Sequence, residues 1–340
     1  EIKYNTDNKM YQPSDYSSYV KFNDNDIYHE LQKKVDKFKP DIIFWSAISS
    51  HIHGEGEYVN IEYGYKLVEK LNTSALKVTG GLQPTASPEM ILNRFKDIDI
   101  LIRGESELVL TEVVNKHKNI EELHQINGIS YLKDNIIHKT TRQPIISNLD
   151  VIGKYDYSIF DEQVLYRAYN GQVIKAVDYE LSRGCIYACD YCVETVIQNY
   201  YGFNEVNRGT IKNAKKYLRS KSAKRIFEEV KTLHYDLGVT LFRCQDTNFL
   251  TIDRNVLTEL AELFEQEQLD IKLYIETRPE GINERSIELL KKLRVDGAGM
   301  GVELSAENFR QDVLNRYANQ DKIIKAFKIL KEHNIKRTAY

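Results

Sequence analysis

The chain has 340 residues, 42% of them hydrophobic and 29% charged, which is the composition of a soluble globular protein large enough for two domains. Its formal net charge is −3, so it lacks the general basic excess of a nucleic-acid-binding protein, and no nucleic-acid partner is expected. No apolar run reaches the roughly 20 residues that cross a bilayer, and the first residues carry no signal-peptide pattern, so we expect a cytoplasmic protein without a membrane partner.

Short apolar strands alternate with helices in the first half of the chain. Ser87 and Pro88 suit the N-cap and the first position of one of these helices. Strands that alternate with helices predict a parallel sheet covered on both faces. Two further short segments flank Asp134-Asn135 and predict a hairpin. The strands are expected at 41–48, 75–79 and 98–102, the helices at 63–71, from 88 and at 106–117, and the hairpin strands at 129–132 and 136–139.

The same alternation resumes in the second half, after residues 140–175, which have little periodicity. Ser222 is a candidate N-cap and Gly238 a candidate stop for the first long helix. Strands are expected at 177–182, 240–244, 271–275, 299–303 and 336–340, with helices at 222–238, 256–264, 285–293 and 322–333. These are four complete βα units and the start of a fifth, so we expect a (β/α) barrel to continue beyond Tyr340.

The predicted fold class is therefore α/β with two domains. A Rossmann-like α/β domain is expected at 1–145, a linker at 146–175 and a partial (β/α) barrel at 176–340. The stretch 1–35 is polar and has no clear period, so the first βα unit of the N-terminal domain is missing or atypical. The richest basic segment runs from Lys212 to Arg225; a solvated loop and helix face is the simpler interpretation, and an RNA or phosphate contact is the alternative.

Three of the four cysteines lie within eight residues, as Cys185, Cys189 and Cys192 with C-x3-C-x2-C spacing. A tight cluster in a chain of this size indicates a metal site. Iron–sulfur cubes are normally held by four thiolates, so three leave one iron open to another ligand. Zinc would need a fourth nitrogen or sulfur ligand, and the nearest candidate, His234, is far along the chain. Cys244 lies in an apolar strand and is expected to be a core residue.

The motif C-x3-C-x-aromatic-C after a first strand, with Tyr191 as the aromatic, resembles the signature of the radical S-adenosylmethionine (SAM) superfamily. The resemblance implies that Cys185, Cys189 and Cys192 hold a [4Fe–4S] cluster whose fourth iron binds SAM. It further implies that one electron cleaves SAM into methionine and a 5′-deoxyadenosyl radical. An external one-electron reductant of the flavodoxin or ferredoxin type is then needed as a partner.

Three later strand ends extend the resemblance to SAM-contacting positions. Gln245-Asp246-Thr247-Asn248-Phe249 resembles the family segment D-D-x-F, which places Asp246 at the SAM amino group; capping of the next turn is the alternative. Thr277-Arg278-Pro279 resembles a family T-R pattern, and Arg278 would pair with the SAM carboxylate. Gly301-Val302-Glu303-Leu304-Ser305 resembles G-x-E-S with Ser displaced by one position, and Glu303 would accept from the ribose hydroxyls. A helix-start carboxylate is the alternative for Glu303.

The N-terminal half resembles the cobalamin-binding domain that is fused to many radical SAM enzymes. The resemblance rests on a strand at 40–43, on Thr79-Gly80-Gly81 and on Gly104-Glu105, and it implies that these residues contact cobalamin. Ligands of open α/β sheets bind outside the carboxyl ends of the strands, where these residues are expected. The D-x-H-x-x-G motif of one cobalamin family is absent, and neither His51 nor His53 matches it; a loop position without a ligand is the simpler interpretation for both.

Together these features predict a radical SAM enzyme that acts on a small molecule or a peptide. With cobalamin bound, methyl transfer to an unactivated carbon is the outcome that the resemblance implies. Rearrangement or cyclisation without methylation is an alternative within the family. A non-catalytic iron–sulfur or cobalamin sensor module is the alternative from another class, and it would not need the SAM contacts at Asp246, Arg278 and Glu303. The segment 197–217, which follows the cysteines, is expected to cover the site.

Overall fold

A computed structural model describes residues 18–21, 25–46 and 64–340, and the chain divides into two compact units. The N-terminal unit comprises Asp24–Ile146 and Val196–Gly202, and the barrel unit comprises the remainder. Two of these boundaries differ from the sequence-based ones: the predicted linker 146–175 lies almost entirely in the barrel unit, and a short segment after the cysteines joins the N-terminal unit. His51, His53 and the end of the predicted strand 41–48 lie outside the described residues.

The N-terminal unit is built on a five-stranded sheet in sequence order. Its first three strands are parallel and the last two form an antiparallel hairpin, as predicted. Asp134 and Asn135 both have positive φ, 50° and 60°, which is the conformation of a two-residue turn of type I′. The strands are β1 (Ile42–Ser46), β2 (Leu76–Gly80), β3 (Ile100–Ile102), β4 (Ile129–Lys133) and β5 (Ile136–Lys139).

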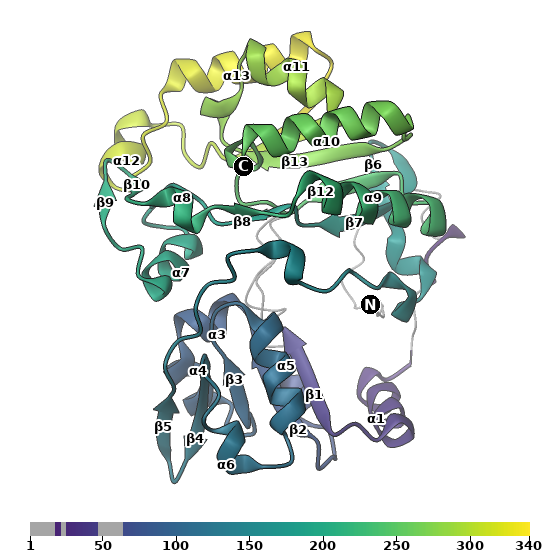
Figure 1. Cartoon of the computed structure of the whole chain (residues 1–340), viewed down its shortest axis with the longest axis vertical. Helices are drawn as coiled ribbons and strands as arrows, with labels where there is room; N and C mark the ends of the chain where they lie inside the picture. Colours follow the sequence, from purple (N-terminus) through teal and green to yellow (C-terminus); the bar gives the residue numbers. More distant parts are fainter. Residues whose placement is uncertain (1–17, 22–24, 47–63) are drawn as a thin grey trace. The chain divides into compact units, whose positions relative to one another are not determined.

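The short central strands of this sheet are covered on both faces, so their apolar side chains pack into two separate clusters, one on each face. On one face Ile100 and Ile102 pack with Val109 and Val113 of α5, and on the other Leu101 packs in a second cluster. Figure 1 shows α5 on one side of the sheet and α3 and α4 on the other. The described helices are α1 (Ile27–Phe38), a segment at 64–69, α3 (Leu82–Ala86), α4 (Pro88–Arg94), α5 (Ser106–Lys116) and α6 (Ile120–Leu123). Pro88 opens α4 as predicted, but Ser87 makes no side-chain capping bond.

The barrel unit contains a six-stranded sheet with the order β15-β14-β13-β12-β7-β6. Five strands are parallel and successive in the chain, which confirms the partial (β/α) barrel, and β6 adds an antiparallel edge. The predicted linker contains β6 and the start of β7, joined at Asn170-Gly171, both with positive φ. The strands are β6 (Tyr166–Tyr169), β7 (Gln172–Tyr179), β12 (Leu241–Cys244), β13 (Lys272–Thr277), β14 (Val295–Met300) and β15 (Lys336–Ala339).

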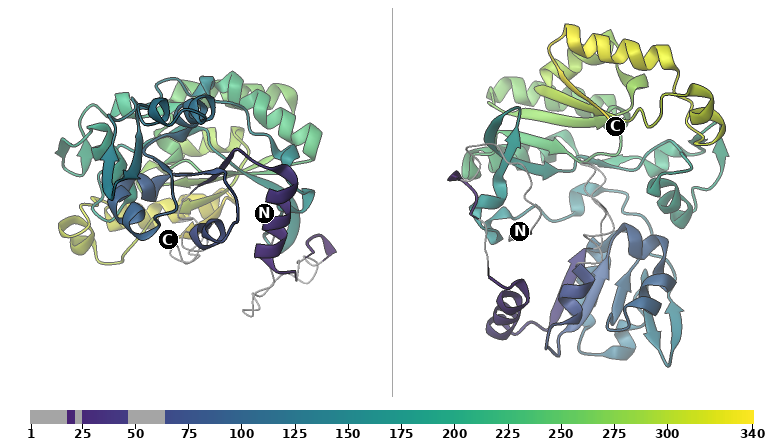
Figure 2. Two further views of the ribbon diagram at one scale, coloured as in Figure 1. Left: turned by 90° about the horizontal axis from the view of Figure 1, so that it is seen from below. Right: turned by 180° about the vertical axis from the view of Figure 1, so that it is seen from behind.

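Four long helices cover one face of this sheet (Figure 2) and share its main hydrophobic core. Ser222 caps the first of them through a bond from the Arg225 amide, and Gly238 ends it in the left-handed conformation, as predicted. The predicted strand 299–303 is wrong at its end: β14 stops at Met300, and Glu303 has a φ of 66° that no strand accommodates. The helices are α9 (Ala223–Leu237), α10 (Arg254–Glu267), α11 (Glu284–Lys292) and α13 (Gln320–Glu332).

Small elements follow β7 and β14, where the chain leaves the sheet. They are β8 (Ser182–Arg183), α7 (Val193–Tyr201), β9 (Val206–Asn207), β10 (Thr210–Ile211), α8 (Ala214–Tyr217), β11 (Arg219–Ser220) and α12 (Glu307–Asp312). None of the helices in the described part of the chain is long and apolar enough to cross a membrane.

Candidate functional site

The three clustered cysteines lie on one loop between β8 and α7. Cys185 and Cys189 are buried and Cys192 is half-buried. The loop turns back on itself, since the Cys192 amide donates to the Cys189 carbonyl at 3.1 Å and the Thr195 hydroxyl donates to the same oxygen at 2.8 Å. Gly184 opens the loop with a φ of 95°, and a Cβ there would lie 2.6 Å from the Tyr217 carbonyl oxygen. This approach requires Gly.

Burial governs the acidity of these thiols. It raises the pKa of Cys185 to about 12 and that of Cys192 to about 11. The thiols of Cys185 and Cys192 are therefore neutral in the absence of a cation, and binding of a metal would displace their protons. No three His, Cys, Asp or Glu side chains of the described residues are arranged to hold a single ion; in an iron–sulfur cube each thiolate binds its own iron. Cys244 is fully buried in the core of the barrel unit, as predicted.

Two segments distant in sequence hold the cysteine loop in place. The hairpin β9–β10 pairs with it: the Ala188 amide donates to Gly209 at 2.9 Å, and the Ile211 amide donates to the carbonyl of Ile186 at 2.8 Å. A segment after α12 binds the other side. The Asp190 amide donates to Leu314 at 3.1 Å, and the Asn315 side chain donates to the Ala188 carbonyl at 2.9 Å. Three backbone–backbone hydrogen bonds and one from a side chain thus fix the loop, and a sequence pattern does not reveal them.

Arg278, at the end of β13, reaches the cysteine loop. Its Nη1 donates to Cys189 Sγ at 3.5 Å, and its guanidinium lies 3.6 Å from the centre of the Tyr187 ring. Nε and Nη2 donate to Glu280 at 3.1 and 2.6 Å. The ion pair with Glu280 raises the pKa of Arg278 against the opposing effect of burial. A permanent positive charge therefore lies beside one of the predicted cluster ligands.

Tyr191 and Glu303, both predicted SAM contacts, lie together around Arg316. Arg316 Nη1 donates to the Tyr191 hydroxyl at 3.3 Å and lies 4.0 Å from Glu303 Oε1, while Nη2 donates to the Gly301 carbonyl. Arg316 is buried, and within the described residues its Nε has no hydrogen-bond partner. Arg316 could not be predicted from the sequence, because a lone Arg in a loop outside any motif carries no signal of its own.

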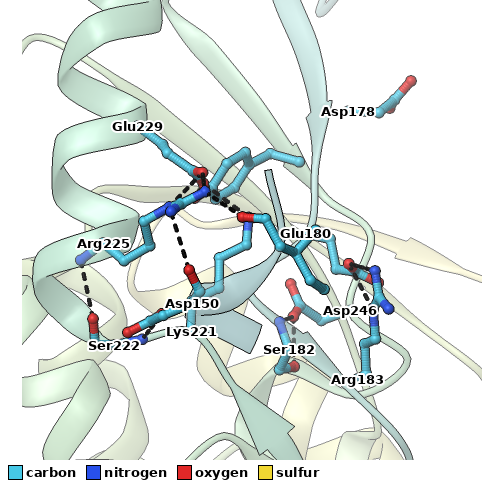
Figure 3. A network of polar contacts seen from close by, with 12 residues as sticks. Asp150, Asp178, Glu180, Ser182, Arg183, Lys221, Ser222, Arg225, Glu229 and Asp246 are labelled. Atoms are coloured by element: carbon cyan, nitrogen blue, oxygen red, sulfur yellow. Dashed lines mark hydrogen bonds and ion pairs between the residues drawn. The ribbon is translucent and has the colours of Figure 1, made fainter. Parts of the chain in front are cut away.

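Asp246 is fully buried directly after β12 and faces the start of the cysteine loop (Figure 3). Its Oδ1 accepts from both the amide and the hydroxyl of Ser182 at 2.5 Å. Burial raises the pKa of this carboxyl to about 7. Oδ2 is buried without a hydrogen-bond partner in the described part of the chain. Asp246 therefore positions Ser182 and still has one oxygen that can accept from a ligand.

A buried charged network supports the strand that leads into the loop (Figure 3). The Glu229 carboxylate accepts from Lys221 at 2.8 Å, from the Tyr179 hydroxyl at 2.5 Å and from Arg225 at 2.7 Å. Lys221 and Glu229 side chains are each only 3% exposed. These bonds lower the pKa of Glu229 although burial opposes them. Because Lys221 also donates its amide to the Leu181 carbonyl, the network fixes the backbone four residues before Cys185.

The sheet face opposite the four helices carries polar side chains near the ends of the strands. Along β13, Leu273 and Ile275 lie in the core, so Tyr274 and Glu276 lie on the opposite face. Burial raises the pKa of Glu276 to about 7, and the Tyr340 hydroxyl donates to it at 3.0 Å. A Cβ at Gly299 would collide with the Glu276 carboxylate, so Gly lets that side chain lie across β14. The alternation of apolar and polar residues in β13 was the available signal for Glu276, which sequence reasoning missed.

The five predicted cobalamin-contacting residues lie at the carboxyl ends of β2 and β3, as expected for a ligand edge. Thr79 is buried and its hydroxyl donates to the Trp45 carbonyl, which is a bond within the sheet. A Cβ at Gly80 would lie 2.7 Å from Ser106 Oγ, so this Gly serves packing. Gly81 has a φ of 125° and begins α3.

Gly104 and Glu105, after β3, contact the end of α7. The Gly104 amide donates to the Thr85 hydroxyl at 2.7 Å, and the Glu105 amide donates to the Tyr201 hydroxyl at 2.8 Å. Gly104 has a φ of 81°, and a Cβ there would collide with Tyr201. The Glu105 carboxylate accepts from the Ile146 amide at 2.8 Å. These residues therefore organise the strand edge and the segment that lies on it.

Comparison with known proteins identifies the second half of the chain. Residues 179–340 match the model of the Radical SAM superfamily. The chain is 27% identical over 278 residues, 81% of its length and 54% of the relative's, to the uncharacterized methyltransferase PH0819 of Pyrococcus horikoshii. It is 26% identical over 319 residues to the anaerobic magnesium-protoporphyrin IX monomethyl ester cyclase of Cereibacter sphaeroides, covering 91% of this chain and 47% of the cyclase. The chain thus spans about half the length of these curated relatives.

Solved structures share the fold over both units. The cobalamin-dependent SAM radical enzyme OxsB, with aqua-cobalamin and SAM bound, superposes with a TM-score of 0.65 at 17% identity, over 92% of this chain and 42% of that one. The radical SAM methyltransferase TsrM from Kitasatospora setae, with tryptophan and a SAM analogue, gives 0.66 at 15% identity, over 93% and 59%. These TM-scores show a common fold, an N-terminal α/β domain followed by a (β/α) barrel domain.

Proposed function

We propose that this chain, which belongs to the radical SAM superfamily, uses a [4Fe–4S] cluster to cleave SAM reductively and generate a 5′-deoxyadenosyl radical. One observation carries the proposal: two buried cysteines and one half-buried cysteine share a loop that contacts the buried cations Arg278 and Arg316. A cluster with three thiolates has one open iron, and SAM has a carboxylate that needs a cationic partner. The cofactor supplies the radical chemistry and the protein orients it.

The residues around the loop fit SAM in complementary ways. The buried Oδ2 of Asp246, unpartnered in the described part, suits an ammonium group. Arg316 has an unpartnered Nε and lies beside Tyr191, so it suits a carboxylate at least as well as Arg278, which already binds Glu280 and Cys189. The Glu303 carboxylate could accept from two hydroxyl groups. We therefore add Arg316 to the predicted SAM contacts.

We further propose that cobalamin binds at the carboxyl edge of β1–β3 and that methyl transfer to an unactivated carbon is the reaction. The support is the shared fold with cobalamin-bound structures and the position of Gly81, a residue without a side chain, directly after β2. Cyclisation is the second candidate, because the chain also resembles an enzyme named as a cyclase. The substrate is a small molecule or a peptide, and a one-electron carrier is the partner.

The test is anaerobic reconstitution with iron and sulfide, followed by reduction and measurement of 5′-deoxyadenosine, with and without cobalamin. We expect about four irons per chain and release of 5′-deoxyadenosine. Cys185→Ala should lose the cluster, whereas the matched variant Cys244→Ala should retain it, because Cys244 lies in the core. A cluster that never cleaves SAM would instead support the sensor module. Cobalamin retention is read separately from its absorption spectrum.

A further inference from the structure

We propose that the basic surface of the β9–β10 hairpin and α8 is the docking site of an acidic one-electron carrier protein that reduces the cluster. The inference rests on the proposed function, which requires a reductant, and goes beyond it by locating the surface that receives it. We define the basic face by Arg208, Lys212, Lys215 and Lys216. All four side chains are exposed.

The basic face is the exposed part of a stretch of unusual charge. Residues 206–225 contain eight Lys or Arg and no Asp or Glu, in a chain whose net charge is −3. Lys221 and Arg225 are occupied inside the molecule by Glu229. The four residues of the basic face instead point to solvent, and the ion pair between Lys212 and Glu205 is itself exposed. A predominantly basic patch on a chain of negative net charge attracts an acidic partner and steers its approach.

This face is joined directly to the predicted cluster ligands. The Ile211 amide donates to the Ile186 carbonyl and the Ala188 amide donates to Gly209, so the hairpin and residues 186–188 are neighbouring strands. Tyr187 and Thr210 form an antiparallel bridge between these two hydrogen bonds. Cys185 and Cys189 flank the same three residues. The hairpin is therefore hydrogen-bonded to the segment that connects two predicted cluster ligands, so a carrier docked on it lies close to the cysteine loop.

Exposed apolar side chains lie at the same place. Tyr317 is 52% exposed, and its ring approaches the hairpin so closely that a Cβ at Gly209 would lie 2.8 Å from it. Val313, at the end of α12, is 50% exposed and Val206 on β9 is 44% exposed. Figure 1 shows α12 next to β9 and β10. An apolar centre with a polar rim is the usual arrangement of a protein–protein interface.

The reaction at this surface is a single-electron transfer. The reduced carrier loses one electron, and [4Fe–4S]²⁺ gains it to become [4Fe–4S]⁺, with no bond formed or broken between the proteins. An acidic flavin- or iron–sulfur-containing carrier protein fits this chemistry. An RNA strand would also be attracted by the cations, but it would not explain why they lie beside the cysteine loop. We therefore favour the carrier protein, and the experiment below would detect RNA binding as a contrary result.

The experiment compares two reductants on the reconstituted full chain. Cluster reduction is followed by stopped-flow absorbance with a reduced acidic flavodoxin or with titanium(III) citrate. The test variant is Lys212→Glu/Lys215→Glu/Lys216→Glu. The matched control is Lys322→Glu/Lys325→Glu/Lys328→Glu, which reverses three exposed charges on α13 of the same unit. We expect the test variant to slow reduction by flavodoxin about tenfold or more at low salt, since steering acts on association rates.

The remaining readouts separate the possible failures. Titanium(III) citrate should reduce both variants at the wild-type rate, and added salt should bring the flavodoxin rates together. In the wild type, zero-length crosslinking of flavodoxin carboxylates should join Lys215 or Lys216, which tests the surface without a variant. Equal flavodoxin rates in both variants, or crosslinks elsewhere, would overturn the docking site. So would RNA binding at this face with unchanged reduction. Absence of the cluster by iron analysis would instead refute the proposed function.

Discussion

Replacing Asp246 by Asn tests whether the buried carboxyl beside the cysteine loop destabilises the fold at neutral pH. Burial raises its pKa from an ordinary 3.8 to about 7. Between these values the unfolded chain has released the proton and the folded chain still binds it, so the stability contributed by this group falls as pH rises. The difference between the two pKa values corresponds to about 4 kcal/mol, present below pH 4 and lost above pH 7.

The Asn variant removes this titration while its amide oxygen still accepts from Ser182. Relative to the wild type, its free energy of unfolding should therefore rise by about 4 kcal/mol between pH 4 and pH 8. We would measure urea unfolding of the cluster-free chain by circular dichroism, since the four long helices of the barrel unit dominate the helical signal. Trp45, the single Trp, lies in the N-terminal unit and reports on that unit separately.

Asp253→Asn is the matched control, because Asp253 is an exposed N-cap of α10 that Asn can replace. It should show no comparable gain between the two pH values. A stability difference for Asp246→Asn that stayed constant from pH 4 to pH 8 would refute the reasoning, since it would mean that the carboxyl titrates alike in the folded and unfolded chain. SAM cleavage by the same variant then tests the predicted amino-group contact independently.

Three further variants probe the supports of the site. Lys221→Met removes one of the cations that bind the buried Glu229 carboxylate and should lower the free energy of unfolding by about 3 to 5 kcal/mol. The control Lys224→Met, at an exposed neighbouring position, should lower it by less than about 0.5 kcal/mol. Equal effects of the two variants in urea unfolding would contradict the network's role. Arg278→Gln removes the positive charge beside the cluster ligand and should make the cluster's midpoint potential more negative in an EPR-monitored titration, with unchanged iron content. Gly104→Ala should destabilise the N-terminal unit by about 1 to 3 kcal/mol, because Gly104 has a positive φ and the Tyr201 side chain leaves no room for a Cβ. The measurement is urea unfolding followed by Trp45 fluorescence. An unchanged unfolding transition would disprove the close contact between Gly104 and Tyr201.

Features with a local signal could be predicted from the sequence. The cysteine spacing located the loop, and Ser222 and Gly238 marked the ends of α9 because capping depends on nearby residues. The turn at Asp134-Asn135 was identified for the same reason, and Asn170-Gly171 carries an equally strong hairpin signal that was passed over within the supposed linker. The turns and helix ends that the structure confirms are thus those that depend on interactions between residues close in sequence.

Features that depend on tertiary contacts could not be predicted. Arg316 reaches the site only because Leu314 and Asn315 bind the backbone of the cysteine loop, more than a hundred residues away in sequence. The bonds of Asp246 to Ser182 likewise depend on the pairing of β7 with β12. The residue types at such positions are ordinary, so only the assembled fold distinguishes them from any other Arg or Asp.

The helix α7 has a consequence for the modularity of this chain. Its first residues, up to Thr195, belong to the barrel unit, and the rest of the helix, from Val196 to Tyr201, belongs to the N-terminal unit. A cut at residue 146 would therefore deprive the N-terminal unit of the side chain that binds the Glu105 amide. The two units cannot be exchanged by recombination at a single crossover without damage. An evolutionary or laboratory exchange would have to transfer the strand edge and the end of α7 together.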